Sequence, residues 1–168
     1  MERYGLREAR TLQERLLPWE RMKREDLARV VLWNALEPSE KDWLTLTDPE
    51  RTLLWHVTDA AGDLAAAVWV IPSGLCGTVH FVMFRAFRAD AVNMGRQTLR
   101  ALFADRPFAA LAAVFPAPYR HIPPFIVRLG FRLWPQVFPA ACPMPTRKRP
   151  ARCFDMRFAL LCRSDVPS

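Results

Sequence analysis

The chain has 168 residues, of which 51% are apolar and 24% charged, as expected of one globular domain. This excludes a disordered tail protein, a collagen-like repeat and a small disulfide-held scaffold. The formal charge is +7, which suits a polyanionic partner, either a phosphorylated cofactor or a nucleic acid. The longest apolar runs, at 64–71 and 109–118, are far shorter than the roughly 20 residues that span a membrane.

The N-terminal stretch mixes acidic residues with arginines and has no apolar segment, so we expect neither a signal nor a transit peptide. The cysteines, Cys76, Cys142, Cys153 and Cys162, have no metal-binding spacing. We therefore expect free thiols, a cytoplasmic protein and no bound metal.

The first 48 residues have a mainly helical pattern. Residues 1–18 show a loose helical period, and residues 24–38 predict an amphipathic helix that ends at Pro38. A second, short helix is predicted after Ser39, because Asp42 follows three residues later and the pair can cap a helix.

From residue 51 the pattern becomes that of strands. RTLLWHVT and LAAAVWVI, joined by DAAGD, predict a β-hairpin, and residues 78–84 predict a further strand. Residues 91–105 predict a helix, and the apolar segment 108–115 is short enough for a strand. A helix between two such strands favours a right-handed parallel crossover.

The remaining residues predict a helix, a strand, a loop and a final strand. Pro123 and Pro124 are tolerated only in the first turn of a helix, and Gly130 suits its C-terminal end. Residues 131–138 predict a strand, residues 139–150 a proline-rich loop, and residues 153–162 the last strand. We expect a single domain over 1–168, an α/β fold with its sheet core at 51–163.

The segment 118–132 reads PYRHIPPFIVRLGFR, and its Leu129-Gly130-Phe131 ending leads into a strand. Placed after a hairpin, a strand, a helix and a strand, this ending resembles the GNAT (Gcn5-related N-acetyltransferase) superfamily over residues 50–163. The layout is also similar to short GNAT-like proteins of phage and prophage clusters. The resemblance implies a mixed, mostly antiparallel sheet of six to seven strands with helices on both faces. It further implies that strands 78–84 and 108–115 are parallel and splayed, with acetyl-CoA between them as cosubstrate.

In that family the pantetheine arm bonds to the exposed backbone of the first of these two strands. The pyrophosphate lies on the amides at the start of the next helix, where unpaired donors favour an anion. The cofactor-binding residues implied here are Met83, Phe84, Arg85, Arg88, Ala89, Asp90, Ala91 and Arg96.

Two positions depart from the family pattern. The family's phosphate loop has the form Arg/Gln-x-x-Gly-x-Gly/Ala, and no register here supplies it, whether Arg88 leads or Gly95 ends the loop. Asp90 would also repel a pyrophosphate. The tyrosine that many members use as general acid, four residues before the glycine, is replaced by Ile126.

The resemblance directs attention to two catalytic candidates. Tyr119, at the entrance of the helix, is the candidate acid for the departing thiolate, and His80 is the candidate base for the acceptor amine. His121 is the reserve base. An anchoring aromatic and a structural histidine are the competing interpretations of Tyr119 and His80.

The leading hypothesis is an acetyl-CoA-dependent N-acetyltransferase, a monomer or homodimer, that acts on an unidentified primary amine. The alternative is a catalytically inactive GNAT-fold scaffold or assembly protein of phage or prophage origin, which the two departures motivate. A nucleic-acid binder that uses the basic segment 147–152 is the least favoured interpretation, since this segment lies in a proline-rich loop without interleaved aromatic residues.

Overall fold

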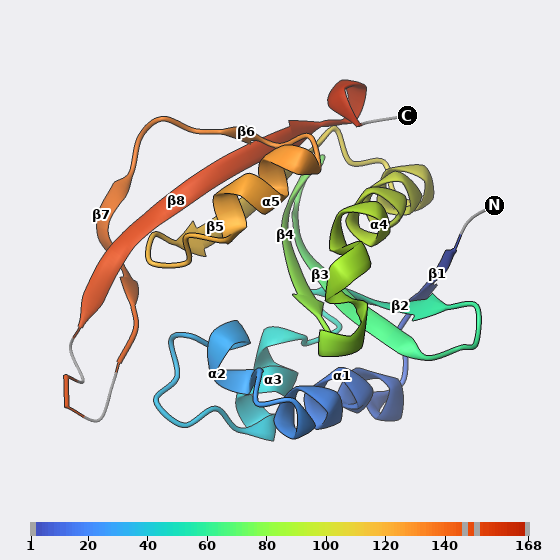
Figure 1. The fold of residues 1–168 in the computed structure, drawn as a ribbon, viewed down its shortest axis with the longest axis horizontal. Helices are drawn as coiled ribbons and strands as arrows, with labels where there is room; N and C mark the ends of the chain where they lie inside the picture. Colours follow the sequence, from blue (N-terminus) through green and yellow to red (C-terminus); the bar gives the residue numbers. More distant parts are fainter. Residues whose placement is uncertain (1–2, 146–147, 150–151, 167–168) are drawn as a thin grey trace.

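The computed structural model describes residues 3–145, 148–149 and 152–166, and Figure 1 shows how their helices and strands are arranged. The helices are α1 (Leu12–Arg24), α2 (Ala28–Val31), α3 (Glu40–Leu46), α4 (Ala91–Asp105) and α5 (Ile122–Arg128), with short 3-10 helices η1 (Arg85–Asp90) and η2 (Arg163–Asp165). The strands are β1 (Tyr4–Glu8), β2 (Leu53–Asp59), β3 (Leu64–Ser73), β4 (Cys76–Met83), β5 (Ala110–Pro116), β6 (Arg132–Leu133), β7 (Phe138–Pro143) and β8 (Cys153–Cys162).

The described strands form one eight-stranded sheet in the order β1-β2-β3-β4-β5-β8-β6, and β7 also pairs with β8. The β4–β5 pair is parallel, as expected of two strands joined by a helix, and the pairs on either side of it are antiparallel. The mixed, mostly antiparallel sheet is confirmed. It has more strands than the expected six to seven because β1 and β7 form in segments assigned to helix and loop.

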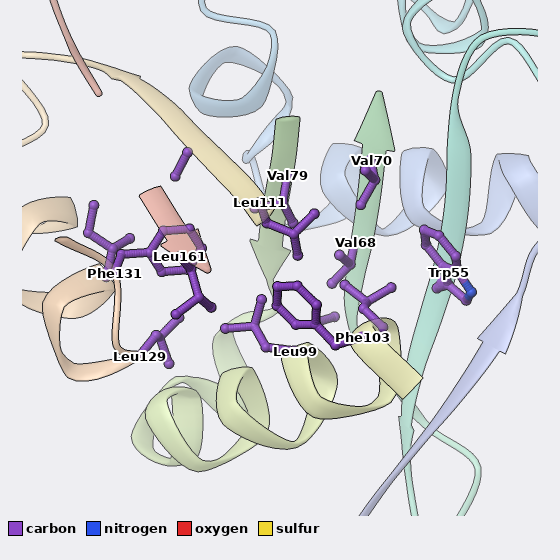
Figure 2. Close-up of a cluster of buried hydrophobic side chains, with 14 of the residues drawn as sticks. Trp55, Val68, Val70, Val79, Leu99, Phe103, Leu111, Leu129, Phe131 and Leu161 are labelled. Atoms are coloured by element: carbon purple, nitrogen blue, oxygen red, sulfur yellow. The ribbon is translucent and has the colours of Figure 1, made fainter. Parts of the chain in front are cut away.

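Two hydrophobic cores lie on opposite faces of this sheet. Along β3, Val68 and Val70 face the core under α4 and α5, whereas Ala67 and Trp69 face the core under α1 and α3. Figure 2 shows the first core, where Leu99 and Phe103 of α4 lie against the sheet beside Val68 and Val79. Figure 1 shows α4 and α5 together on one side of the sheet and α1, α2 and α3 on the other.

Several predicted elements are confirmed. The hairpin forms as β2 and β3, and α4 and β8 occupy the predicted residues 91–105 and 153–162. The Ser39 hydroxyl accepts a hydrogen bond from the Asp42 amide, and the Asp42 carboxylate accepts one from the Ser39 amide. Gly130, with φ of 100°, follows α5 in the left-handed conformation that ends many helices.

The expectation of a helix over residues 1–18 is wrong for its first part. β1 pairs with β2, and its alternation of buried Tyr4 with exposed Gly5 has the strand period of two. The helix begins only after Thr11 and contains Pro18. Because Pro18 has no N–H to donate to the Glu14 carbonyl, that carbonyl is free, and it accepts a hydrogen bond of 2.8 Å from His56 Nε2.

The predicted helix over residues 24–38 is also wrong in most of its length. Asp26 has a φ of 53°, a left-handed conformation that a helix does not tolerate, so the chain turns there. Only Ala28–Val31 forms a helix, α2. Leu27 and Leu32 of this segment are nevertheless buried in the core under α1 and α3.

The last part of the chain differs in two places. The predicted strand over 131–138 is reduced to the two residues of β6, and β7 forms within the predicted proline-rich loop. Pro139 and Pro143 are compatible with β7 because it pairs with β8 alone, so their missing N–H groups break no second ladder. Ala140, with φ of 49°, lies where the β7–β8 register shifts.

Candidate active site

β4 and β5 separate soon after they begin. They pair only through Cys76↔Ala110, Gly77↔Leu111 and Thr78↔Ala112. Beyond these pairs, β4 remains bonded to β3 as far as Met83, and β5 remains bonded to β8 as far as Pro116. Figure 1 shows the two strands diverging from this short contact. The expected splayed, parallel pair is therefore confirmed.

The edge of β4 that faces the gap carries unpaired backbone groups. The Phe84 amide donates to the Ala65 carbonyl of β3, whereas the next amide, that of Arg85, points away from β3 and donates to the Glu25 carboxylate. Successive residues of a strand direct their N–H and C=O groups to opposite sides. Phe81 and Met83 therefore direct theirs toward β5, where no strand receives them because the β4–β5 ladder ends at Thr78.

A cleft of about 680 Å³ occupies the space where the strands part. Its walls are residues 79–83 of β4, residues 113–116 of β5, the start of α5, and the α1–α2 region with Asp26, Leu27 and Trp33. The volume lies within the range of sites that bind small molecules. Both the sheet and the N-terminal helices can therefore contact a ligand in the cleft.

A second pocket, of about 500 Å³, lies at the N-terminus of α4. It shares Arg88, Ala91, His121 and Phe125 with the cleft, so the two pockets adjoin at these residues. The first amides of a helix have no partner within it, and the helix dipole is positive there. The second pocket is therefore suited to an anion that continues from a ligand in the cleft.

Arginines surround this second pocket. Arg88 is exposed, and no described residue forms an ion pair or hydrogen bond with its guanidinium group. Arg96 donates two hydrogen bonds, of 3.1 and 2.9 Å, to the backbone carbonyl of Arg128 at the end of α5. These bonds hold Arg96 in place beside the pocket, while Arg88 is free to bind a ligand.

The Asp90 carboxylate, which the sequence suggested would repel a phosphate, is engaged by other groups. It accepts a hydrogen bond of 2.8 Å from the Tyr4 hydroxyl and lies 3.3 Å from the Arg3 guanidinium. Gly95 has a different role from that of a phosphate loop glycine. It lies inside α4, where a Cβ would come within 2.8 Å of a Leu129 methyl, so it allows α4 and α5 to pack closely.

The other implied cofactor residues are not all at the cleft. Met83 and Arg85 line it, Ala91 lines both pockets, and Ala89 lines the second pocket. The expectation that Phe84 binds the cofactor is corrected by the structure. Its side chain is fully buried in the core under α1 and α3, and its amide is bonded to β3. Because residues alternate along β4, Phe84 faces the opposite way from Met83 and cannot reach the gap through its side chain or its amide.

His80 lies on β4 and lines the cleft. Its ring stacks on that of Trp69, the neighbouring residue of β3, with centroids 5.3 Å apart and planes 8° apart. Burial lowers the pKa of His80 to about 4, so the imidazole is uncharged at neutral pH. An uncharged imidazole can accept a proton, although its basicity is lower than that of an exposed histidine.

Tyr119 lies in the turn before α5 rather than inside the helix, and it lines the cleft. Its hydroxyl donates to the Val30 carbonyl of α2 at 3.4 Å, a long hydrogen bond that is easily broken. Burial raises the pKa of Tyr119, so the hydroxyl keeps its proton at neutral pH. His121 stacks beside it, and Ile126 lies buried at the cleft, where it offers no proton.

Sequence patterns did not single out Asp26 or Trp33, which also line the cleft. The sequence pattern predicts a continuous helix for their segment, whereas the chain turns at Asp26, which has a left-handed conformation. Arg128, which lines the second pocket, was missed because its position depends on how α5 packs beside α4.

No group of three or more potential metal ligands occurs among the described residues, and the cysteines described there are free. No helix among the described residues is long and apolar enough to cross a membrane. Within the basic segment 147–152, residues 147, 150 and 151 lie outside the described residues. Arg152 lies over the Phe154 ring, 4.1 Å from its centroid.

No protein-family model and no curated protein matches the sequence. Solved structures match over nearly the whole chain. The spermidine N-acetyltransferase of Vibrio cholerae, in complex with CoA and spermine, is 11% identical, covers 98% of both chains and has a TM-score of 0.76. A GNAT-family acetyltransferase of Bacillus anthracis is 13% identical over 97% of this chain and 96% of its own, with a TM-score of 0.72.

The ribosomal-protein-S5-alanine acetyltransferase of Vibrio fischeri is 12% identical and covers all of this chain and 97% of its own, with a TM-score of 0.69. None of these three descriptions refers to a phage protein, so the expected similarity to phage members gains no support. The parted parallel strands and the agreement over both chains establish that this chain has the fold of the GNAT acetyltransferases.

Proposed function

We propose that the protein transfers an acetyl group from acetyl-CoA to a primary amine. The observation that carries this proposal is the pair of adjoining pockets that extends from the parted strands to the N-terminus of α4. The outward backbone groups of Phe81 and Met83 fit the amides of a pantetheine arm. The α4 amides and Arg88 fit its phosphates. The neighbours described as acetyltransferases, one of them in complex with CoA, support the same ligand.

Acetyl-CoA supplies an activated acetyl thioester when it is bound. In the transfer, the amine nitrogen forms a bond to the acetyl carbon and the carbon–sulfur bond breaks. One proton leaves the nitrogen and one joins the sulfur, so the reaction needs a base and an acid near the thioester. The chain has an uncharged imidazole and a protonated phenol at the cleft, those of His80 and Tyr119.

His80 accepts the amine proton, directly or through a water molecule. Its stacking on Trp69 fixes the plane of the ring, so the imidazole does not turn out of the cleft. Tyr119 gives its proton to the departing thiolate, for which its hydroxyl exchanges the long bond to the Val30 carbonyl for one to sulfur. Unpaired β4 amides stabilise the negative charge that develops on the thioester oxygen.

The experiment is a titration of the purified protein with CoA by calorimetry, followed by an assay of thiol release from acetyl-CoA with a panel of amines. Val114→Trp, which adds bulk to the β5 wall of the cleft, should abolish CoA binding. Val127→Trp is the matched control, because Val127 lies 49% exposed on α5 and does not line the cleft. Tyr119→Phe should lower kcat about 100-fold without weakening CoA binding.

Two outcomes would contradict the proposal. Absence of CoA binding would contradict the assignment of acetyl-CoA to the cleft. Binding of CoA without transfer to any amine would favour the inactive scaffold, for which the buried Ile126 at the usual acid position is the specific observation. Equal kcat for Tyr119→Phe and the unmodified protein would remove only the role assigned to that hydroxyl.

A further inference from the structure

The wall of the cleft nearest the N-terminus is apolar. Leu27, at the start of α2, is buried, and Val30, Val31 and Trp33 continue this wall through α2 and the residues after it. On the opposite side of the cleft, the Tyr119 hydroxyl donates its long hydrogen bond to the Val30 carbonyl of α2. An acceptor that reaches the thioester from this side therefore lies against hydrocarbon and an indole ring.

Asp26 is the single carboxylate among the described residues that line the cleft. It is exposed at the end of α1, and no described residue pairs with its carboxylate. The neighbouring Glu25 carboxylate is occupied, because it accepts from the Arg85 amide at 2.7 Å and from Arg21 Nε at 3.0 Å. The site thus offers one free negative group to an ammonium ion.

The other charged groups at the cleft oppose a multiply charged cation. Arg85 and Arg88 line it, and the whole chain has a formal charge of +7. A polyamine would bring several ammonium groups to a site with one carboxylate, and those left unpaired would lie against the apolar wall or face the arginines. Both arrangements are costly, since an unpaired charge loses its hydration there.

An amine with one charge and an apolar body meets no such penalty. Its body can lie against Val31 and Trp33, and its ammonium group can pair with Asp26 before it loses a proton. His80, uncharged at neutral pH, adds no repulsion.

We propose that the acceptor is a small primary monoamine with an aromatic or branched apolar body, and that Asp26 is the residue that holds its ammonium group. This proposal rests on the acetyltransferase function above, because it assigns the second substrate of the same cleft. It names a class of amine that differs from the polyamines in both charge and shape.

The first test is a calorimetric titration of the CoA-saturated protein with phenethylamine and with spermidine. We expect phenethylamine to bind at least about tenfold more tightly, because the ammonium groups of spermidine that Asp26 does not pair would lose hydration in the cleft. Asp26→Asn should weaken phenethylamine binding about tenfold, and asparagine retains the left-handed conformation of this position. Glu50→Gln, which removes an exposed carboxylate away from the cleft, is the control and should leave binding unchanged.

The second test adds a carboxylate to the apolar wall. Val30 is 46% exposed, so Val30→Glu can be accommodated, and it should raise spermidine binding about tenfold relative to the isosteric, uncharged Val30→Gln. Binding of CoA alone, measured first, tests the proposed function separately. CoA binding combined with a preference of the unmodified protein for spermidine, or with an Asp26→Asn variant indistinguishable from Glu50→Gln, would overturn the present inference alone.

Discussion

Arg88 provides the sharpest test of how the cofactor is bound. It lies at the junction of the cleft and the second pocket, and its guanidinium group has no partner among the described residues. Removing it therefore breaks no internal bond. A charge-assisted hydrogen bond from an exposed arginine to a phosphate contributes about 1.4 kcal/mol, so Arg88→Ala should weaken acetyl-CoA binding about tenfold.

The assay is calorimetry with two ligands, acetyl-CoA and acetyl-pantetheine, which has no phosphate. The Arg88→Ala effect should be confined to acetyl-CoA, and it should diminish as the salt concentration rises, because salt screens an exposed charge. Arg100→Ala is the matched control, since Arg100 is an exposed arginine of α4 that lines neither pocket. Equal weakening of both ligands, or no difference from Arg100→Ala, would refute this reasoning.

Three further predictions concern the fold around the site. Tyr4→Phe frees the Asp90 carboxylate near the phosphates and should weaken acetyl-CoA binding about threefold, as measured by calorimetry. Gly77→Ala places a Cβ 2.5 Å from a Val70 methyl in the core and should lower the free energy of unfolding by about 1–2 kcal/mol in urea titrations. His80→Gln should reduce the loss of stability on acidification: the folded-state pKa is lowered to about 4, so the unfolded state takes up the proton first as pH falls through 6.5.

Each of these has a control or a contrary outcome. Tyr4→Phe should leave acetyl-pantetheine binding unchanged, and an equal effect on both ligands would contradict the role given to Asp90. Gly5→Ala should be nearly neutral, since its Cβ would meet only the Thr58 hydroxyl at 3.4 Å. Urea titrations at pH 7 and at pH 4.5 that show the same loss of stability with and without His80 would contradict its lowered pKa.

Local pattern was sufficient for the central part of the chain. The apolar period of residues 91–105, the Ser39 and Asp42 pair and the run 153–162 each specify an element without reference to distant residues. The position of Gly130 after a proline-led helix also follows from local conformational preference. The order of these elements predicts the parallel pair, whereas the gap beside it was implied by the resemblance to the GNAT superfamily.

Long-range contacts decided the rest. β1 is a strand because β2 offers it a partner. The helix expected over residues 24–38 does not form, because the chain turns at Asp26 in a left-handed conformation. The Asp90 carboxylate accepts a hydrogen bond from the hydroxyl of Tyr4, which lies 86 residues away in the sequence. The sequence by itself determined the central hairpin, α4 and β8, since periodicity is local. Tertiary structure decided which charges at the site are free, because partners so distant in the chain leave no local pattern.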